Sequence, residues 1–544
     1  MSWHISLPDR GYETAHENFS WGIPDGYNVA HDVLRKHDNP DRTGLYQMYP
    51  NGEVEEFTFH DLDVRSGQLA SSLKQLSVGF GDRVAVVLSQ KPANPLTHLA
   101  CWKLGAISVP LSVLFGEDAL RYRLDHSGAR VAVIDSSVRE TVADIREDCP
   151  DLEHVIEVDG ETGGTDGVRS FAEFSERNSR VRWLAETKVE TPATILYTSG
   201  STGKPKGVLH THGVWLGQCP GFYMYNERSV SESVHWTPAD WAWVGALGGL
   251  VFPAWHYGRP VVGYPMGGFD ANEAFEVLEA FDVTNAFIPP TAIRMMMEVD
   301  NPSKQYDLEL EVIGSGGESL TTEILDWASE SLDECRVNEF YGQTEAPLVI
   351  ADCQDWFPAR TGSMGKPAPG HEVAIVDGES GEEVPTGEVG QIAVRRSENP
   401  AILQRYWNQP ERTAETILGD WHLTGDLGRE DEEGYIWFKA RDDDLIITSG
   451  YRVGPGEVED SILEHPKIEQ VGVIGVPDET RGEIIKAFVQ PVDGVRTASD
   501  LREEIRRQVR DNLAKHEYPR EIEFVSQLPT TTTGKIQRSK LHDY

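Results

Sequence analysis

The chain has 544 residues, and its 89 aspartates and glutamates against 49 lysines and arginines give a formal net charge of −40 at pH 7. This length predicts two or more domains, because a single hydrophobic core stops growing well below it. The acidic balance argues against nucleic acid and anionic membranes as partners.

Composition also bears on the source and the compartment. Acidic, lysine-poor surfaces are typical of proteins from saline cytoplasm, where counterions screen the repulsion between carboxylates, so we expect a halophilic protein. The start MSWHISLPDRGYETAHE lacks the basic end and apolar core of a signal peptide, which favours a cytoplasmic location. The five cysteines show no CxxC spacing, so neither a zinc site nor a disulfide framework is indicated.

Short β-prone runs alternate with helical stretches along most of the chain. Strands are expected at Arg83–Ser89, Val131–Asp135 and Val312–Glu318, and a helix at Asn272–Phe281. The apolar run Trp241–Trp255 is interrupted by a proline and is shorter than the roughly 20 residues of a membrane-spanning helix. We therefore expect a buried wall there and no integral membrane segment.

The stretch YTSGSTGKPKG, Tyr197–Gly207, predicts a phosphate-binding loop. Glycines let backbone amides approach a ligand, and hydroxyl groups and lysines donate hydrogen bonds to oxygen. The flanking runs TILY and GVLHTH are expected to be β structure. It is not a Walker A loop, since Gly203-Lys204 is followed by Pro205 and the glycine spacing differs. The alternative is a glycine-rich surface turn.

The residue composition changes in the C-terminal part of the chain. Glycine- and glutamate-rich turns over Asp377–Arg395 are typical of hairpin-rich β structure. Beyond the acidic turn in Lys439–Pro455, strands are expected at Val471–Asp478 and Ile484–Val492 and an amphipathic helix at Ser499–Leu513.

These elements predict an α/β fold in two parts. Residues 1–442 would form a large layered α/β N-terminal body with a β-rich closing subdomain. Residues 443–544 would form a small mobile α+β C-terminal lid.

Ordered motifs run from Tyr197 to Arg538. After the glycine-rich loop come GGE (Gly316–Glu318), YGQTE (Tyr341–Glu345), HLTGD (His422–Asp426), ARDDDLI (Ala440–Ile446) and TTTGKIQR (Thr531–Arg538). In this order the chain resembles the adenylate-forming superfamily, which includes acyl-CoA synthetases, firefly luciferase and the adenylation domains of peptide synthetases. SGYRVGPGEVE and EYPREIEFV narrow the resemblance to medium-chain acyl-CoA synthetases.

The resemblance implies an AMP-forming acyl-CoA synthetase. A carboxylic acid and ATP would give an acyl-adenylate and diphosphate, and coenzyme A would then give acyl-CoA and AMP. ATP, Mg²⁺ and coenzyme A are the implied cofactors and substrates, with a medium-chain, branched or aromatic acid. The sequence does not decide between a monomer and a homo-oligomer.

The matched motifs imply the ATP site. Donors of the glycine-rich loop would hold the phosphates: Thr198, Ser199, Gly200, Ser201, Thr202, Gly203, Lys204 and Lys206. The next two motifs and their flanks would line the adenine and α-phosphate side: Gly317, Glu318, Ser319, Glu339, Phe340, Tyr341, Gly342, Gln343 and Thr344. Tyr341 offers an aromatic face to adenine, and Thr344 offers a hydroxyl to the α-phosphate. Glu345 and Thr198 are the predicted Mg²⁺ ligands, and a solvated carboxylate is the alternative for Glu345.

Three further residues complete the implied adenylation chemistry. Asp426 matches the carboxylate that accepts both ribose hydroxyls, and Arg441 matches a ribose- and phosphate-contacting arginine. Lys535 would act with Thr344 and Glu345 as a catalytic residue, bridging the acid and the α-phosphate while negative charge builds. The local alternatives are a Thr-Gly-Asp turn, an ordinary salt bridge and a solvated lysine.

The implied lid would turn between the two half-reactions. Asp443 matches the hinge, with a simple acidic linker as the alternative. Ser449, Gly450 and Tyr451 resemble the segment that lines the pantetheine tunnel, and Arg481 resembles a cation near the phosphates of coenzyme A.

The acid site is implied by another set of residues. The apolar run with Trp241, Trp243, Val244 and Leu247 resembles the wall of the acyl pocket in medium-chain enzymes. Trp241, Gly316 and Arg452 resemble acyl-binding positions, although plain core packing is the alternative for Trp241 and an ordinary surface arginine for Arg452. Acetate-specific relatives carry a tryptophan just beyond the YGQTE segment. Here the stretch Ala346–Leu348 follows, which predicts an open pocket floor.

Other functions stay open on the same residues. An adenylation enzyme could deliver its acyl group to a carrier protein, but the medium-chain-like lid counts against this. A luciferase-like oxygenase is a weaker alternative. A non-catalytic nucleotide sensor is disfavoured because Glu345, Asp426 and Lys535 are all present, and a sensor has no need of Lys535.

Overall fold

The computed structural model of the protein describes residues 4, 5, 7, 11–159, 168–176, 184–198, 204–230, 232–318, 320–333, 335–442, 444–448, 451–478, 482–492, 494–495, 499–513, 517–530 and 536–542. The chain forms two compact units. The first comprises Met1–Ser199, Pro205–Val373 and Val394–His422, and the second Gly200–Lys204, Ala374–Ala393 and Leu423–Tyr544. Within the described ranges, no helix is both long enough and apolar enough to cross a membrane.

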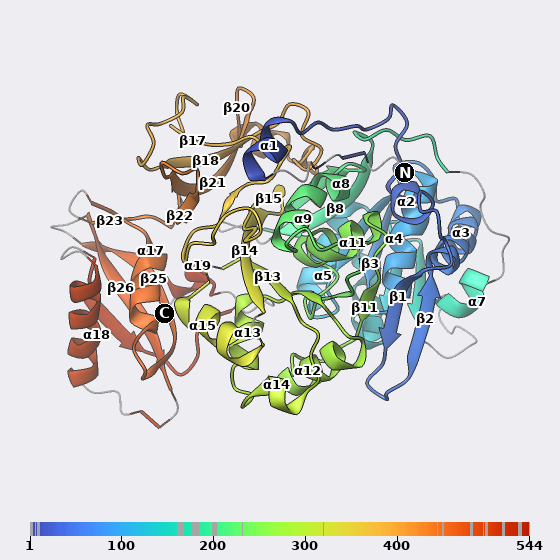
Figure 1. Ribbon diagram of the computed structural model, residues 1–544. Helices are drawn as coiled ribbons and strands as arrows, with labels where there is room; N and C mark the ends of the chain where they lie inside the picture. Colours follow the sequence, from blue (N-terminus) through green and yellow to red (C-terminus); the bar gives the residue numbers. More distant parts are fainter. Residues whose placement is uncertain are drawn as a thin grey trace. The chain divides into compact units, whose positions relative to one another are not determined.

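The first unit contains a nine-stranded sheet with the order β16-β15-β14-β13-β12-β10-β11-β1-β2 (Figure 1). Its strands are β1 (Thr43–Met48), β2 (Val54–Thr58), β10 (His235–Trp236), β11 (Val261–Gly263), β12 (Asn285–Phe287), β13 (Val312–Gly316), β14 (Arg336–Gln343), β15 (Ala346–Ala351) and β16 (Lys366–Pro367). All neighbours between β14 and β1 are parallel, and β2, β15 and β16 add antiparallel edges. Every residue of β13 is buried, as expected for a parallel strand covered on both faces.

An eight-stranded sheet lies in the same unit, with the order β19-β9-β8-β4-β3-β5-β6-β7. Its strands are β3 (Arg83–Val87), β4 (Ile107–Leu111), β5 (Val131–Asp135), β6 (His154–Val158), β7 (Val168–Ser170), β8 (Pro192–Thr198), β9 (Lys206–Thr211) and β19 (Arg405–Tyr406). The pairing of β3 with both β4 and β5 is parallel, whereas β8 and β9 form an antiparallel pair. The predicted β runs on both sides of the glycine-rich loop are therefore confirmed.

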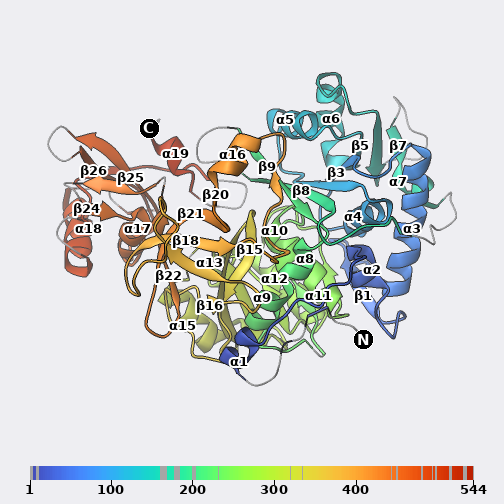
Figure 2. The same cartoon turned by 90° about the horizontal axis from the view of Figure 1, so that it is seen from above.

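Helices connect and cover these two sheets. They are α1 (Tyr12–Glu17), α2 (Val29–Leu34), α3 (Phe59–Gln75), α4 (Ala93–Leu104), α5 (Glu117–Ser127), α6 (Arg139–Ile145), α7 (Phe171–Glu176), α8 (Val214–Gly217), α9 (Cys219–Tyr225), α10 (Val244–Ala246), α11 (Phe252–His256), α12 (Ala271–Ala280), α13 (Pro290–Met296), α14 (Pro302–Gln305), α15 (Thr322–Ser331) and α16 (Pro410–Glu415). Helix α3 begins at a capping box formed by Thr58 and Asp61, and it packs along α4 (Figure 2). The π-helical turn η3 (Leu247–Val251) joins α10 to α11.

A five-stranded sheet forms the predicted β-rich region. It consists of β17 (Val373–Val376), β18 (Gly390–Arg395), β20 (Ile417–Leu418), β21 (Trp421–Glu430) and β22 (Ile436–Arg441). Strand β21 pairs with β20 and with β22 in antiparallel register.

The C-terminal part of the second unit is a separate α+β layer. Its elements are β23 (Ile446–Thr448), β24 (Tyr451–Val453), β25 (Ile468–Asp478), β26 (Gly482–Pro491), β27 (Glu521–Phe524), α17 (Pro455–Leu463), α18 (Ser499–Asn512) and α19 (Arg538–Leu541). Val473 and Val489 pack in one core with α17 and α18, while their neighbours Ile474 and Phe488 pack with Leu541 of α19. Figure 2 shows the corresponding helices on opposite faces of this sheet. Side chains that alternate along a strand point to opposite faces, which explains this division.

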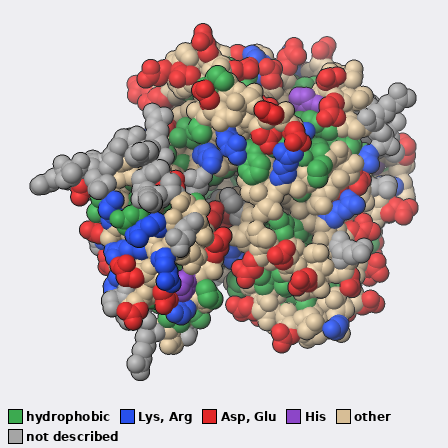
Figure 3. Space-filling model, turned by 60° about the vertical axis from the view of Figure 1, so that its left-hand side comes forward, with side chains coloured by type: hydrophobic (Ala, Val, Ile, Leu, Met, Phe, Trp, Pro, Cys, Tyr) green, Lys and Arg blue, Asp and Glu red, His purple; other side chains and the backbone are tan. Residues whose placement is uncertain are grey.

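The mixed α/β architecture with a smaller C-terminal α+β part confirms the predicted fold class. Asp443 lies outside the described residues, so the position of the hinge remains a prediction. Figure 3 shows carboxylate side chains distributed over the whole visible surface, with lysine and arginine side chains interspersed in small groups. This distribution agrees with the formal charge of −40.

Candidate active site

The predicted phosphate-binding loop connects the antiparallel strands β8 and β9. Thr198 and Lys206 are paired across the two strands, at the point where the loop leaves and returns. Both side chains are half-buried, whereas Lys204 is exposed. The other predicted donors lie outside the described residues: Ser199, Gly200, Ser201, Thr202 and Gly203. The structure therefore fixes the base of the loop.

The YGQTE motif comprises the last three residues of β14 and the two-residue turn to β15. Gly342 is required there, because an added Cβ would lie 2.2 Å from the backbone nitrogen of Leu348. Tyr341 and Gln343 are half-buried, so the turn keeps an accessible face. Leu348, in β15, adopts φ = 53°, a left-handed conformation that costs about 1–3 kcal/mol for a non-glycine residue and is often found near functional sites.

A histidine from β9 holds the turn at Thr344. The Nε2 atom of His210 lies 2.6 Å from the backbone oxygen of Thr344. Burial lowers the pKa of His210 to about 4, so the ring is neutral at pH 7 and donates its single N–H there. Because His210 and Lys206 lie on the same strand, this bond ties the YGQTE turn to the base of the phosphate-binding loop.

Glu345 is held by Tyr406, which was not among the site residues predicted from the sequence. The hydroxyl of Tyr406 donates a 2.7 Å hydrogen bond to Oε1 of Glu345, and the Leu403 N–H donates to the backbone oxygen of Glu345 at 2.8 Å. The Nζ atom of Lys206 lies 5.2 Å from the centre of the Tyr406 ring, within cation–π range. Tyr406 thus brings the predicted metal ligand and a predicted phosphate ligand into one cluster.

The residues predicted beside the adenine lie directly after β13 and on β14. Glu339 is buried, and its Oε2 accepts from the Leu320 N–H at 3.3 Å. Gly316 packs against Phe340, so closely that a Cβ would meet the Phe340 backbone oxygen at 2.5 Å. Gly317 has φ = 94°, which favours glycine. Glu318 pairs with Arg294 at 3.3 Å, and Ser319 lies outside the described residues.

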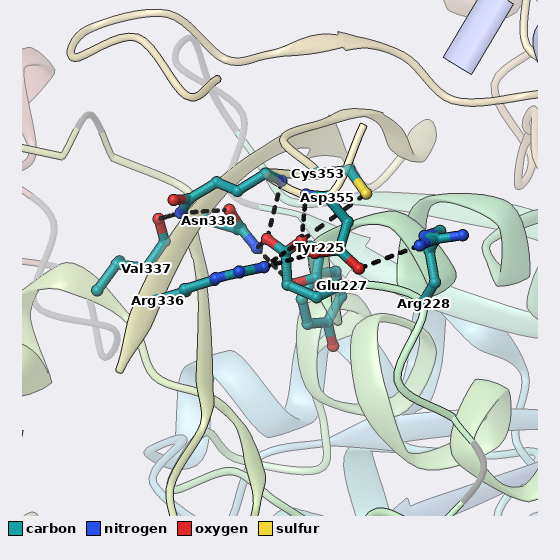
Figure 4. Close-up of polar contacts among 9 residues, drawn as sticks. Tyr225, Glu227, Arg228, Arg336, Val337, Asn338, Cys353 and Asp355 are labelled. Atoms are coloured by element: carbon teal, nitrogen blue, oxygen red, sulfur yellow. Dashed lines mark hydrogen bonds and ion pairs between the residues drawn. The ribbon is translucent and has the colours of Figure 1, made fainter. Parts of the chain in front are cut away.

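A buried carboxylate braces the other end of β14 (Figure 4). Glu227 follows α9 and accepts hydrogen bonds from Asn338 on β14 and from the backbone N–H groups of Gln354 and Asp355, the latter two at 2.9 and 2.7 Å. The Nη1 atom of Arg336 lies 3.2 Å from Oε2 of Glu227. The network joins α9, β14 and the segment after β15, so it fixes the strand that presents the YGQTE turn.

The second unit contains the predicted ribose site. Asp426 on β21 and Arg441 on β22 are paired in register, and Nη1 of Arg441 lies 3.3 Å from Oδ1 of Asp426. The Asp426 side chain is 8% exposed and that of Arg441 43%, so the pair presents its arginine to solvent. Gly425 has φ = 74°, and the Asp442 N–H donates to its backbone oxygen at 2.9 Å.

Most predicted lid residues lie outside the described residues: Asp443, Ser449, Gly450, Arg481 and Lys535. Tyr451 and Arg452 begin β24. Arg538 forms two ion pairs. Its Nη1 lies 3.0 Å from Oδ2 of Asp444, and its Nε donates to Oε1 of Glu459 at 3.0 Å. Thr530 and Ile536 form an antiparallel bridge, so the two ends of the TTTGK segment are held together.

The predicted acyl wall has one covered and one accessible tryptophan. Trp241 has no exposed surface, and its Cη2 atom lies 3.1 Å from the position that a Cβ on Gly263 would occupy. Trp243, Val244 and Gly245 are half-buried and therefore line accessible space. Trp241 packs in the core, as the alternative interpretation expected, and any role in acid binding stays a prediction.

No group of three or more histidines, cysteines, aspartates or glutamates forms a metal site among the described residues. The five cysteines are free and buried.

Comparisons with known proteins cover almost the whole chain. The models of the AMP-binding enzyme family and of the AMP-binding enzyme C-terminal domain match residues 34–407 and 457–535. The chain is 35% identical to the human mitochondrial acyl-coenzyme A synthetase ACSM4, over 96% of this chain and 91% of that one. It is also 35% identical to an acetyl-coenzyme A synthetase of Bacillus subtilis, over 98% and 94% of the two chains.

Solved structures show the same fold. An anthranilate CoA ligase in complex with anthranoyl-AMP is 29% identical, with a TM-score of 0.85 over 96% of this chain and 98% of that one. A benzoate CoA ligase from Burkholderia xenovorans is 27% identical, with a TM-score of 0.81 over 95% and 99%. The chain therefore belongs to the AMP-binding enzyme family, and within this adenylate-forming family it is an acyl-CoA synthetase.

Proposed function

We propose that the enzyme activates medium-chain, branched or simple aromatic acids rather than acetate. The accessible part of the predicted acyl wall, Trp243 to Gly245, is apolar, and Phe287 lies close to Gly245. Two of the similar structures act, by their names, on ring-bearing acids, anthranilate and benzoate. A further relative is named for acetate, so the assay that tests the proposal includes acetate alongside the larger acids.

The cluster of Lys206, Tyr406 and Glu345 is the main structural support for the proposed adenylation chemistry. Lys206 would neutralise the phosphates, and Tyr406 would orient the Glu345 carboxylate through the bond to Oε1. A single buried carboxylate fits Mg²⁺, which proteins usually hold through one or two carboxylates and the phosphates of the substrate. When bound there, Mg²⁺ would offset the charge on the departing diphosphate. Thr198, at the base of the same loop, would be the second ligand from the chain.

The nucleoside end of ATP would be held by two sets of residues. Tyr341, on the accessible side of the YGQTE turn, would stack on the adenine. Asp426 would accept hydrogen bonds from the ribose hydroxyls, and its ion pair with Arg441 would keep both side chains in place. Thr344 would donate from its hydroxyl to the α-phosphate, in a turn that His210 fixes through the Thr344 carbonyl.

The lid would supply Lys535 for the first half-reaction and a different face for the second. Lys535 would bridge the acid and the α-phosphate, and rotation about Asp443 would then bring Ser449, Gly450, Tyr451 and Arg481 to coenzyme A. Arg452 would lie near the acyl group. No enzyme nucleophile is required, because the thiol of coenzyme A attacks the mixed anhydride directly.

One assay separates this function from its alternatives. The protein is mixed with ATP, Mg²⁺, coenzyme A and a panel of acids, and AMP and thioester are measured. Equal amounts of AMP and acyl-CoA support the proposal. Acyl-adenylate without transfer to coenzyme A would indicate a carrier-protein enzyme, and ATP binding without AMP would indicate a sensor.

A further inference from the structure

The loop between β10 and α10 carries both tryptophans of the predicted acyl wall. It is ordered internally by Asp240, whose Oδ1 accepts from the Ala242 N–H at 2.9 Å and whose backbone oxygen accepts from the Trp243 N–H at 3.0 Å. The Ala239 N–H donates to the hydroxyl of Thr237 at 3.1 Å. These bonds shape the loop but do not attach it to the rest of the unit.

Attachment comes from Gln90, a buried residue just after β3 of the other sheet. Its Nε2 donates to the backbone oxygens of Thr237 at 2.9 Å and Ala239 at 2.8 Å. Its Oε1 accepts from the Tyr264 N–H at 3.1 Å, and its backbone oxygen accepts from Nε2 of Gln47 at 2.9 Å. Both amide atoms are thus used, and the amide plane can take only one orientation.

A second attachment comes from the neighbouring strand. Ser112 follows β4, which pairs with β3 in parallel register, so Ser112 and Gln90 lie at the same edge of the eight-stranded sheet. Burial raises the pKa of the Asp240 carboxyl, and the nearby Ser112 side chain counteracts this effect. Phe115, three residues further on, meets the Trp243 ring edge-on with centroids 6.2 Å apart. The loop is therefore held on its backbone by Gln90, and its Trp243 ring packs against Phe115.

We propose that Gln90 is a positioning residue for acid selection, which fixes the distance between the Trp243-bearing loop and the rest of the acyl site. This inference rests on the proposed function of that loop as an acyl wall. Gln90 is not one of the residues proposed to bind the acid or ATP, and it would act through the carbonyls of Thr237 and Ala239. Those carbonyls are at the start of the loop. Loss of the Gln90 hydrogen bonds should therefore let the Trp243-bearing loop move, while the proposed ATP-binding residues on β9 and β14 stay in place.

The test compares Gln90→Met with a matched control, Asn28→Leu. Methionine keeps the volume of Gln90 and removes its amide. Asn28 is also a buried amide that donates twice, to the Trp102 oxygen at 2.9 Å and to Thr187 Oγ1 at 3.1 Å, and accepts once, from the Ala30 N–H at 3.0 Å. Both variants lose the same number of bonds, so their melting temperatures should fall by similar amounts. Trp243→Ala serves as the positive control for the wall.

The readout is the ratio of kcat/KM for the best long or aromatic acid to that for acetate, with the KM for ATP measured alongside. We expect Gln90→Met to change this ratio by about threefold or more while the KM for ATP stays within about twofold, and Asn28→Leu to leave the ratio unchanged. If Gln90→Met does not fold, Gln90→Asn is judged by the same criterion, because its shorter amide cannot reach both carbonyls.

Two results would overturn the inference. One rejects only the positioning role of Gln90, and the other also rejects the loop as an acyl wall. An unchanged ratio in the Gln90 variant with a changed ratio in Trp243→Ala would leave the wall in place and reject the positioning role. Unchanged ratios in both variants would reject the loop as an acyl wall, and the inference with it. Neither result would touch the adenylation chemistry, which AMP formation by the unsubstituted enzyme reports separately.

Discussion

The hydroxyl of Tyr406 donates a 2.7 Å hydrogen bond to Oε1 of Glu345, although the two residues are 61 positions apart. Tyr406 lies on β19, which pairs with β9, and its ring faces the ammonium group of Lys206. The hairpin that carries the phosphate-binding loop and the turn that carries the predicted metal ligand are thus joined through one side chain. This arrangement leads to a test of the proposed Mg²⁺ site.

Tyr406→Phe should weaken the use of Mg²⁺. A hydrogen bond to a charged group is worth about 1.5–3 kcal/mol, so adenylation should fall by roughly tenfold or more, with a higher Mg²⁺ requirement. Thioester formation from supplied acyl-AMP should be unaffected, because the diphosphate has already left. Tyr12→Phe is the control, since it loses the hydroxyl bond to the Pro367 oxygen and Tyr12 is not a predicted site residue. An unchanged Mg²⁺ titration for Tyr406→Phe would reject the role of Tyr406.

Lys535→Ala should separate the half-reactions. Its proposed contact forms only as charge builds on the α-phosphate, so adenylate formation should fall by about 10² or more while transfer from supplied acyl-AMP survives. Lys540→Ala, an exposed lysine in α19, is the control and should retain both activities. Equal losses in the two half-reactions of the Lys535 variant would show that the lysine has another role.

Asp443→Pro should trap one lid orientation. Proline fixes φ, and rotation about this residue needs that freedom, so one half-reaction should be impaired far more than the other. Asp443→Ala keeps the backbone freedom and should turn over almost normally. Normal activity in both half-reactions of the proline variant would place the hinge elsewhere, or show that the lid does not turn.

Stability should increase with salt. Screening reduces the repulsion within a chain of formal charge −40, so the melting temperature should rise from low to molar KCl. Sodium chloride should act similarly, because the effect depends on ionic strength. A melting temperature that stays flat over this range would remove the expectation of a halophilic protein.

Local patterns predicted much of the fold. The strand and helix expected at Val131–Asp135 and Asn272–Phe281 correspond to β5 and α12, because hydrophobic periodicity and turn residues act over a few neighbours.

Long-range partners could not be predicted in this way. Nothing near Tyr406 indicates that its hydroxyl reaches Glu345, and nothing near Glu227 indicates that it braces β14. The difference between the two tryptophans has the same origin: Trp241 and Trp243 are two residues apart in the sequence, yet Trp241 is fully buried, with its ring close to Gly263, and Trp243 is only half-buried. Such contacts depend on which strands become neighbours, which local propensity does not encode.

The most direct test of the central claim is a steady-state assay of the unsubstituted enzyme with acids of increasing size. ATP, Mg²⁺, coenzyme A and each acid are combined, and AMP and acyl-CoA are quantified together. Each extra buried methylene contributes roughly 0.8 kcal/mol if the cavity accepts it. We predict AMP and acyl-CoA in equal amounts, with kcat/KM for butanoate to octanoate, branched or simple aromatic acids at least about tenfold above that for acetate. A panel in which acetate wins outright and hexanoate is inert would contradict the acid assignment, and a panel without AMP would contradict the enzyme itself.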